Sequence, residues 1–220
     1  MKNKTEETSE TAFAAKEEII QAAAELFMDL GFTATSIDAI AAKMGATKGR
    51  VYHYFGSKAE IFFDVQRTAM NRLTQLVEPI ARSTDPVDVR LRRMAEAHLS
   101  LLIHDMPVQK VTVQALERYL FESSGFRYVH EIREINKLRD EYEEIFAEVI
   151  DQGTREGVFV DLPPRLLTKP FFGALNWVMV WYRPRKLQDP ESIKVMSDAL
   201  VDFAMRGIRK GGQDGNDGKG

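Results

Sequence analysis

The sequence predicts an all-α protein of about nine helices. Apolar residues recur at intervals of three and four along almost the whole chain, as they do on one face of an α-helix. Glycine and proline separate these periodic segments, and Ser, Thr or Asp residues stand where several of them begin, as helix N-caps do. A chain of 220 residues that is 44% hydrophobic is long enough to bury a core.

The first predicted elements are a longer helix and two short ones. Residues 1–12 are polar, and we expect them to be mobile. A first amphipathic helix then runs to Gly31, and Thr35-Ser36-Ile37-Asp38 has the form of a capping box that opens a second helix, of barely two turns. After the break at Gly45, Thr47 is an N-cap for a third helix, which Gly56 ends.

Longer helices follow, and the last part of the chain closes with a flexible tail. Ser57-Lys58-Ala59-Glu60 has the form of a capping box that opens a long fourth helix. Further helical segments are predicted at about 87–104, 108–121 and 126–152, after Pro163-Pro164, and from Asp189-Pro190 onward, with a flexible tail at 211–220.

Composition excludes several classes of protein. The chain has no cysteine, so it has neither a disulfide framework nor a thiolate site. The N-terminus lacks the apolar core of a signal peptide, and the longest near-apolar run, 170–182, is too short to span a membrane. We therefore expect a cytoplasmic protein with no membrane partner.

The two short helices carry a local positive charge on an acidic protein. The formal net charge is −3, yet no acidic residue lies between Asp38 and Glu60. Four cations fall in that interval, Lys43, Lys48, Arg50 and Lys58. Two short helices joined by a tight glycine turn are typical of a helix-turn-helix, whose second helix enters the DNA major groove. The alternative is a set of solvated charges beside packed aromatic residues.

Two residues of this region favour DNA binding over a structural role. Gly49 allows close approach of the backbone, at a helix-propensity cost of about 1 kcal/mol relative to alanine. Lys58 lies at a helix start, where a cation opposes the helix dipole, and we expect a phosphate to resolve that conflict.

The stretch GFTATSIDAIAAKMGATKGRVYHYFGSKAEIF resembles the DNA-binding head of TetR-type transcriptional regulators. The resemblance implies a three-helix DNA-binding domain at 13–60 and a helical ligand-binding and dimerisation domain at 61–210. It also implies base contacts near Lys48, Gly49 and Arg50. Arg50 stands where the family often has a smaller residue, and it would either read a guanine or grip a phosphate. The phosphate contacts that the resemblance implies are Ser36, Thr47, Tyr52, His53 and Lys58.

The last predicted helix carries an apolar stripe at three- and four-residue steps. Such a stripe is usually plain core. In proteins that resemble this chain, the last two helices pair with their copies in a homodimer, and a palindromic operator requires a two-fold protein. By that resemblance the interface residues are Ile193, Met196, Leu200, Phe203 and Gly207.

The segment FFGALNWVMVWYRPRK, 171–186, suggests a small-molecule ligand. Its helix is apolar almost all round, and Asn176 within it needs a hydrogen-bond partner in the backbone, a partner subunit or a ligand. The Asn-Trp pair and the Trp-Tyr-Arg-Pro run resemble TetR-type repressors of fatty-acid, sterol-ring and aromatic-acid breakdown, several of which respond to acyl-CoA thioesters. The candidate ligand residues are Phe121, Phe126, Arg127, Tyr128, Phe172, Asn176, Trp177, Trp181 and Arg183.

These observations predict a one-component repressor that binds a palindromic DNA operator as a dimer and is released by a small-molecule effector, such as a CoA thioester or fatty acid. The alternative is a TetR-like DNA-binding protein with a filled core, controlled by a protein partner or by no ligand. An enzyme is not expected, because the four histidines show no zinc spacing and no phosphate loop or Gly-x-Ser-x-Gly occurs. No catalytic residue, metal or cofactor is therefore predicted.

Overall fold

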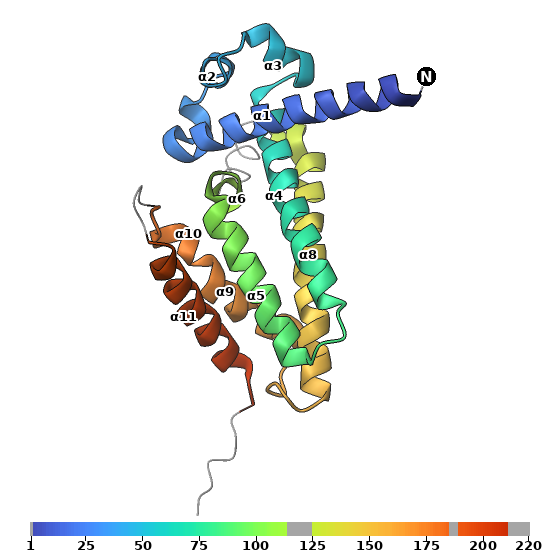
Figure 1. Ribbon diagram of the computed structural model, residues 1–220, viewed down its shortest axis with the longest axis vertical. Coiled ribbons are helices and arrows are strands. Elements are labelled where there is room, and N and C mark those ends of the chain that lie inside the picture. Colours follow the sequence, from blue (N-terminus) through green and yellow to red (C-terminus); the bar gives the residue numbers. More distant parts are fainter. Residues whose placement is uncertain (1, 114–124, 185–188, 211–220) are drawn as a thin grey trace, which may run out of the picture. The chain divides into compact units, whose positions relative to one another are not determined.

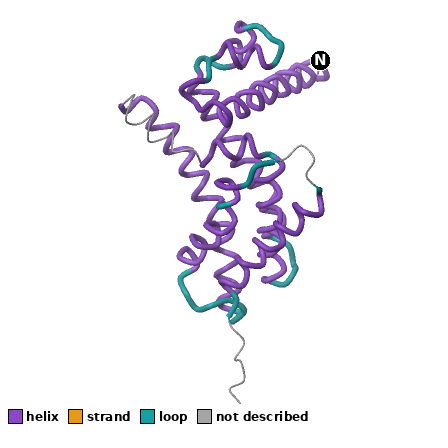
Figure 2. The backbone as a smooth tube through the Cα atoms, turned by 90° about the vertical axis from the view of Figure 1, so that its left-hand side faces the viewer, coloured by secondary structure: helices purple, strands orange, loops and turns teal. Residues whose placement is uncertain are grey.

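The structure is a computed structural model that describes residues 2–113, 125–184 and 189–210. These residues form α-helices and one 3₁₀ helix, and they contain no β-strand beyond an isolated bridge between Phe159 and Arg209 (Figure 2). The predicted all-α class is confirmed. Phe121 and the tail at 211–220 lie outside the described residues, and for Phe126 only the backbone is described.

The helices follow the predicted order closely. In chain order they are α1 (Lys2–Ala34), α2 (Ile37–Lys43), α3 (Lys48–Tyr54), α4 (Lys58–Ala81), α5 (Val87–His104), α6 (Met106–Val113), η1 (Gly125–Tyr128), α8 (Val129–Arg155), α9 (Pro164–Asn176), α10 (Val178–Trp181) and α11 (Pro190–Ile208).

The chain folds into two compact units that alternate along the sequence. Unit 1 comprises Met1–Arg72 and Asp105–Leu138, and unit 2 comprises Leu73–His104 and Arg139–Gly220. The sequence instead suggested consecutive domains with a boundary after residue 60. The difference arises because α4 and α8 are long enough to contribute to both units, a feature that local sequence patterns do not reveal.

Unit 1 is built around α1, with α2 and α3 on one side of it and α6 on the other (Figure 1). The backbone of Gly31 has φ 78° and interrupts α1 where the sequence predicts a stop. α1 begins at Lys2, so the N-terminal residues expected to be mobile are helical here, and their mobility stays a prediction. Phe27 of α1 and Phe62 of α4 share a buried core with Val108 of α6.

Side-chain caps fix the ends of the short helices. Ser36 Oγ accepts a hydrogen bond from the Ala39 N–H at 3.1 Å, and Thr47 Oγ1 accepts one from the Arg50 N–H at 3.4 Å. The predicted N-cap Thr47 is confirmed. The capping box predicted at Thr35-Ser36-Ile37-Asp38 is one residue out of register, because Ser36 caps α2 and the Thr35 hydroxyl instead donates to the Gly31 carbonyl oxygen at 2.8 Å. Gly45, in the turn between them, has φ 62°, a conformation that favours glycine.

Unit 2 consists of α5, α9, α10 and α11 with the C-terminal parts of α4 and α8. α5, α9 and α11 pack against one another (Figure 1). The N-cap of α11 is Asp189, whose carboxylate accepts from the Glu191 N–H at 3.2 Å, as predicted from the Asp-Pro pair. The helix predicted across 171–186 is interrupted at Trp177, which separates α9 from α10.

Candidate DNA-binding surface and effector site

Seven of the eight residues predicted to contact DNA lie on α3 or at the N-caps of α2 and α3, and these seven are exposed; the eighth, Lys58, is the first residue of α4. Val51 and Phe55 face the core instead and are buried. An exposed polar face on a helix held by apolar contacts behind it is the arrangement that a reading helix needs. The exposed members of this reading surface are Ser36, Thr47, Lys48, Gly49, Arg50, Tyr52 and His53.

Lys58 is the exception among the predicted contacts. Its ammonium donates to the carbonyl oxygens of Phe32 at 2.7 Å, Thr33 at 3.3 Å and Thr35 at 2.6 Å, and it lies over the Phe32 ring. Partial burial lowers the pKa of this amine. The conflict between cation and helix dipole is therefore resolved by the carbonyl end of α1 rather than by a phosphate. We remove Lys58 from the proposed DNA contacts.

The cations of the reading surface are paired with acids from other parts of the chain. Lys48 Nζ lies 2.9 Å from Asp38, and Arg50 Nη2 lies 2.7 Å from Glu18 of α1. The hydrogen bond that Lys48 donates to the Asp38 carboxylate raises the pKa of Lys48. Lys43 is likewise paired, at 2.7 Å, with Glu25. The net charge of the region around Lys43, Lys48 and Arg50 is therefore close to zero in the free protein. The sequence between Asp38 and Glu60 does not reveal this, because the acidic partners lie outside that interval.

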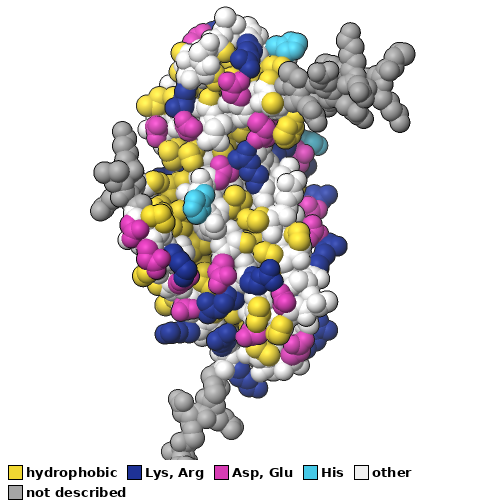
Figure 3. Space-filling model, in the orientation of Figure 1, with side chains coloured by type: hydrophobic (Ala, Val, Ile, Leu, Met, Phe, Trp, Pro, Cys, Tyr) yellow, Lys and Arg dark blue, Asp and Glu magenta, His cyan; other side chains and the backbone are white. Residues whose placement is uncertain are grey.

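Charges of both signs alternate over the whole visible face of the molecule (Figure 3). The ion pairs of the reading surface are exposed, with side-chain accessibilities of 45% for Arg50 and 46% for Glu18. Exposed pairs are weak and exchange readily with other ions. A DNA phosphate can therefore replace Glu18 or Asp38 as the partner of these cations.

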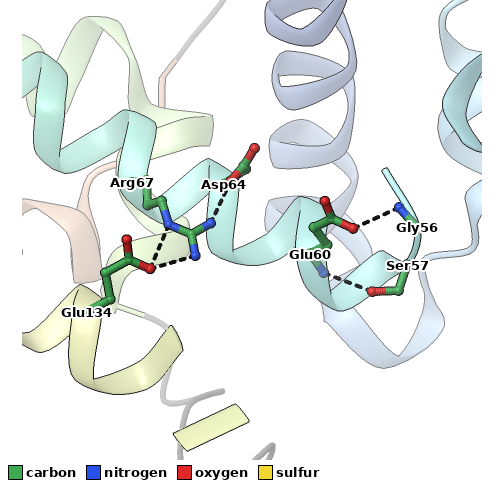
Figure 4. Close-up of polar contacts among 6 residues, drawn as sticks. All are labelled: Gly56, Ser57, Glu60, Asp64, Arg67 and Glu134. Atoms are coloured by element: carbon green, nitrogen blue, oxygen red, sulfur yellow. Dashed lines mark hydrogen bonds and ion pairs between the residues drawn. The ribbon is translucent and has the colours of Figure 1, made fainter. Parts of the chain in front are cut away.

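A second group of ion pairs joins α4 to helices distant in sequence within unit 1. The Arg67 guanidinium donates to Asp64 at 2.5 Å and to Glu134 of α8 at 2.8 Å (Figure 4). Arg72 is paired with Glu17 of α1 and with Asp105 at 2.7 Å. Sequence patterns do not reveal these ion pairs, because 67 residues separate Arg67 from Glu134.

The start of α4 is also fixed by reciprocal capping. Glu60 accepts a hydrogen bond from the Gly56 N–H at 2.7 Å, while the Glu60 N–H donates to Ser57 Oγ at 3.1 Å (Figure 4). The Ser57 half of the predicted capping box is confirmed, whereas the Glu60 carboxylate accepts from the Gly56 N–H rather than from the Ser57 N–H. Because Gly56 directly follows the C-terminal end of α3, this capping fixes the connection between the reading helix and α4.

Two predicted ligand residues, Arg127 and Tyr128, line a cavity of about 430 Å³ in unit 1. The Tyr128 ring packs on buried Phe63, with ring centroids 5.6 Å apart. The Oε2 atom of Glu131 is buried and has no hydrogen-bond partner in the described part of the chain. The remaining lining residues are Ser57, Glu60, Asp64 and Arg67.

Asn176 belongs to a buried polar cluster in unit 2. Its Oδ1 lies 2.9 Å from His98 Nε2, and the Tyr142 hydroxyl lies 2.8 Å from His98 Nδ1. Burial lowers the pKa of His98 to about 4, so the imidazole is neutral at physiological pH, and it raises the pKa of the Tyr142 hydroxyl. His98 and Tyr142 were missed, because a single buried histidine or tyrosine has no sequence signature.

Aromatic rings surround this cluster. The Phe146 ring lies 4.7 Å from the Phe172 ring and 6.2 Å from the His98 ring, measured between centroids. Phe171 and Tyr142 also contact Phe146. Of the predicted ligand residues, the structure thus brings Phe172 and Asn176 together in an aromatic environment.

The other predicted ligand residues in unit 2 lie at its surface. Trp177 is 60% exposed and Trp181 46% exposed. The Arg183 guanidinium donates to the carbonyl oxygens of Val180 and Tyr182, at 3.0 and 2.9 Å. Arg183 therefore caps the end of α10, and the two tryptophans form part of an exposed apolar surface.

The stripe predicted for the dimer interface faces away from the core of unit 2. α11 buries Val201, Ala204 and Met205, whereas Phe203 is 71% exposed. Ile193, Met196 and Leu200 are half-buried, and Gly207 is exposed. The stripe is thus not the buried face of α11, although its use as an interface remains a prediction.

The fold and the exposed reading surface define a helix-turn-helix DNA-binding protein with a second all-α unit. Residues 19–65 match the family described as bacterial regulatory proteins, tetR family, and residues 84–208 match the tetracyclin repressor-like C-terminal domain. The second match alone covers more than half of the chain. The chain therefore belongs to the TetR family of transcriptional regulators, a family of DNA-binding regulators rather than enzymes.

Similar proteins support the assignment over nearly the whole length. The HTH-type transcriptional repressor KstR2 of Mycobacterium tuberculosis is 29% identical over 197 residues, covering 89% of this chain and 93% of that protein. The structure of PfmR, a TetR-family regulator from Thermus thermophilus, matches with a TM-score of 0.73 and 27% identity, covering 87% of this chain and 99% of that one.

A second solved structure shares the fold. AibR, solved in complex with isovaleryl coenzyme A and operator DNA, matches with a TM-score of 0.68 at 20% identity, covering 86% of this chain and 97% of AibR. Within the described part of this chain, no helix is both long and apolar enough to cross a membrane.

Proposed function

We propose that this protein is a homodimeric transcriptional repressor that binds a two-fold DNA operator and releases it when an acyl-CoA thioester binds. The observation that carries the proposal is the reading surface. Its side chains are exposed on a helix anchored by buried Val51 and Phe55, and its cations are held only by exchangeable ion pairs.

Base and phosphate contacts divide along this surface. Lys48, Gly49 and Arg50 lie in the first turn of α3, the part of a reading helix that meets base edges. Arg50 can donate two parallel hydrogen bonds to guanine once Glu18 releases it. The hydroxyl groups of Ser36, Thr47 and Tyr52 suit phosphate contacts around it.

A two-fold operator needs a dimer, and unit 2 offers an apolar surface for one. Large apolar side chains on α10 and α11 are exposed, Val180 by 51%, Trp181 by 46%, Val195 by 60% and Phe203 by 71%. Exposed aromatic residues of this kind typically become buried at interfaces between subunits. We propose that α10 and α11 pair with their copies in a second protomer.

The proposed class of effector rests on two facts about similar proteins and one about this chain. AibR was solved with isovaleryl coenzyme A bound. KstR2, the more similar protein in sequence, is described as a ketosteroid transcriptional regulator. Here the cluster of His98, Tyr142 and Asn176, with its aromatic neighbours, combines apolar bulk with a few polar groups, as small-molecule sites do.

Release follows from linkage between the two sites. An effector that binds better to a conformation unable to bind DNA weakens DNA binding by a coupling free energy. Bound DNA weakens effector binding by the same free energy. Coupling of about 1–3 kcal/mol is typical, which predicts a loss of operator affinity of about 5- to 150-fold.

The test begins with selection of an operator from random duplex DNA by the purified protein. We expect enrichment of an inverted repeat with half-sites about one helical turn apart. Fluorescence anisotropy with that duplex then measures affinity in the presence of short-, medium- and long-chain acyl-CoA thioesters, their free acids and CoA. Release by a thioester supports the proposal. If the DNA is bound but no small molecule releases it, the effector part fails.

A further inference from the structure

His98, Tyr142 and Asn176 form a hydrogen-bonded chain in unit 2 that starts in the core and ends at a half-exposed amide. His98 is 2% exposed and Tyr142 is 4% exposed. These hydrogen bonds connect α5, α8 and the C-terminal end of α9. The hydrogen-bonded chain has no part in DNA reading, so its polar groups require another explanation.

The protons in the hydrogen bonds between Tyr142, His98 and Asn176 have a single consistent arrangement. A neutral imidazole has one N–H donor and one nitrogen lone pair. Tyr142 has no hydrogen-bond partner other than His98 among the described residues, so its hydroxyl must donate to Nδ1 to satisfy its proton. His98 then carries its own proton on Nε2 and donates it to Asn176 Oδ1. The reverse direction would bury an unsatisfied hydroxyl proton, which is costly.

This direction fixes the orientation of the Asn176 amide. Its oxygen is occupied by His98, and its two N–H donors have no acceptor in the described parts of the chain. Phe172, one helical turn before Asn176, packs its ring against the His98 ring, with centroids 5.3 Å apart. Gly173 lies between them in sequence and is exposed, so no atom of the described residues lies within 4 Å of the position that a side chain would occupy there.

We propose that the Asn176 amide donates a hydrogen bond to the thioester carbonyl oxygen of the effector, and that His98 and Tyr142 are positioning residues that hold the amide in the donating orientation. This inference rests on the proposed function, because it specifies how the thioester effector is recognised. A neutral N–H donor is matched to a neutral carbonyl oxygen, whereas a free carboxylate is better held by a cation.

The experiment uses pairs of ligands that differ by the carbonyl oxygen alone. Isovaleryl-CoA, octanoyl-CoA and palmitoyl-CoA are each compared with the corresponding S-alkyl-CoA thioether by isothermal titration calorimetry. For the wild-type protein we expect at least one thioester to bind about 10- to 100-fold more tightly than its thioether, because the thioether leaves the amide unpaired.

The substitution Asn176→Asp distinguishes the acceptor role of the amide oxygen from the donor role of the amide N–H groups. The substitution retains an oxygen acceptor for His98 but removes both donors, so we expect the preference for thioester over thioether to disappear. Asn71→Asp, on the exposed side of α4, adds the same charge elsewhere and should leave the preference unchanged. Tyr142→Phe removes the proton that fixes the histidine tautomer, and it should lower the preference by about 2- to 10-fold. The ¹⁵N chemical shifts of His98 should then show a changed tautomer.

The outcomes separate this inference from the proposed function. If a thioester binds and releases DNA, but the wild type and Asn176→Asp show the same affinity preference for thioester over thioether, the inference is wrong while the proposed function stands. If Asn176→Asp abolishes dimerisation, the amide pairs with a partner subunit and the inference is also wrong. If no thioester binds the wild-type protein, the effector class and this inference both fail, and DNA binding is unaffected.

Discussion

The reading surface on α3 and the His98 cluster in unit 2 satisfy their polar groups in opposite ways. On α3, Lys48 and Arg50 are exposed and held by acids that other ions can replace. In unit 2, His98 is buried, neutral and bound on both ring nitrogens by fixed partners. The first region can exchange its partners for a polyanion with little reorganisation, whereas the second contributes to the fold itself.

This contrast predicts where pH acts most strongly. The pKa of folded His98 is lowered to about 4, below its ordinary value of 6.5, so the unfolded chain binds the proton at higher pH. Stability from the neutral imidazole is fully present above about pH 6.5 and is lost as pH falls toward 4. At about 1.4 kcal/mol per pKa unit the loss approaches about 3 kcal/mol.

Denaturant unfolding at several pH values between 4 and 7 measures this loss. His98→Gln cannot titrate, and it should show a shallower dependence of the free energy of unfolding on pH than the wild type. Parallel pH curves for the two proteins would show that His98 is not the group responsible.

A steric change in unit 2 should lower stability without touching the reading surface. A Cβ at Gly153 of α8 would lie 2.2 Å from the Phe159 ring, which is buried. Gly153→Ala should therefore cost about 1–3 kcal/mol in the free energy of unfolding, as overpacked cores do. Gly173→Ala, where nothing lies within 4 Å, is the matched control and should be neutral or slightly stabilising. Equal melting temperatures for the two variants would contradict the packing.

The converse change on α3 should lower DNA affinity without affecting the fold. Arg50→Ala removes an exposed side chain whose ion-pair partner, Glu18, is itself exposed, so the melting temperature should stay within about 2 °C of wild type. We expect operator affinity to fall about tenfold, which corresponds to about 1.4 kcal/mol. Anisotropy titrations at several salt concentrations distinguish the roles of Arg50. An unchanged salt dependence indicates a base contact, and a slope reduced by about one indicates a phosphate contact.

The smallest predicted effect concerns the acid that competes with DNA. Glu18→Gln removes the charge that pairs with Arg50 at 2.7 Å, so the guanidinium no longer has to exchange one carboxylate for a phosphate or base. We expect DNA affinity to rise about 2- to 5-fold at low salt and the gain to fade as salt screens the interaction. Glu10→Gln changes the net charge equally and serves as the control. A gain of the same size in both variants would reduce the effect to net charge.

Local sequence patterns were sufficient to predict the elements but not their long-range pairing. The helix starts at Thr35-Ser36, Thr47 and Asp189-Pro190 were identified to within one residue, because capping depends on residues three positions apart or fewer. The pairing of Arg50 with Glu18, across 32 residues, was invisible in the sequence, so the local charge was overestimated. Lys58 was assigned to phosphate for the same reason, since its carbonyl partners lie more than 20 residues away.

In the candidate effector site, too, the sequence did not reveal a hydrogen-bond partner that is distant along the chain. Asn176 was conspicuous, because an amide inside an apolar segment needs a partner. Its partner, His98, lies 78 residues earlier, in a segment that reads as an ordinary amphipathic helix. A sequence can thus show that a polar group needs a hydrogen bond before it shows which residue provides one.

The contacts of Lys58 also have a consequence for engineering. Its ammonium holds Phe32 and Thr35, the residues just before Ser36, to the first turn of α4. The two ends of the segment from 36 to 57 are thereby held together by the contacts of one side chain. Such a segment can be exchanged as one cassette for that of another regulator, provided that the lysine and its carbonyl partners are retained. If the reading surface binds DNA as proposed, we expect such an exchange to transfer DNA specificity without changes to unit 2.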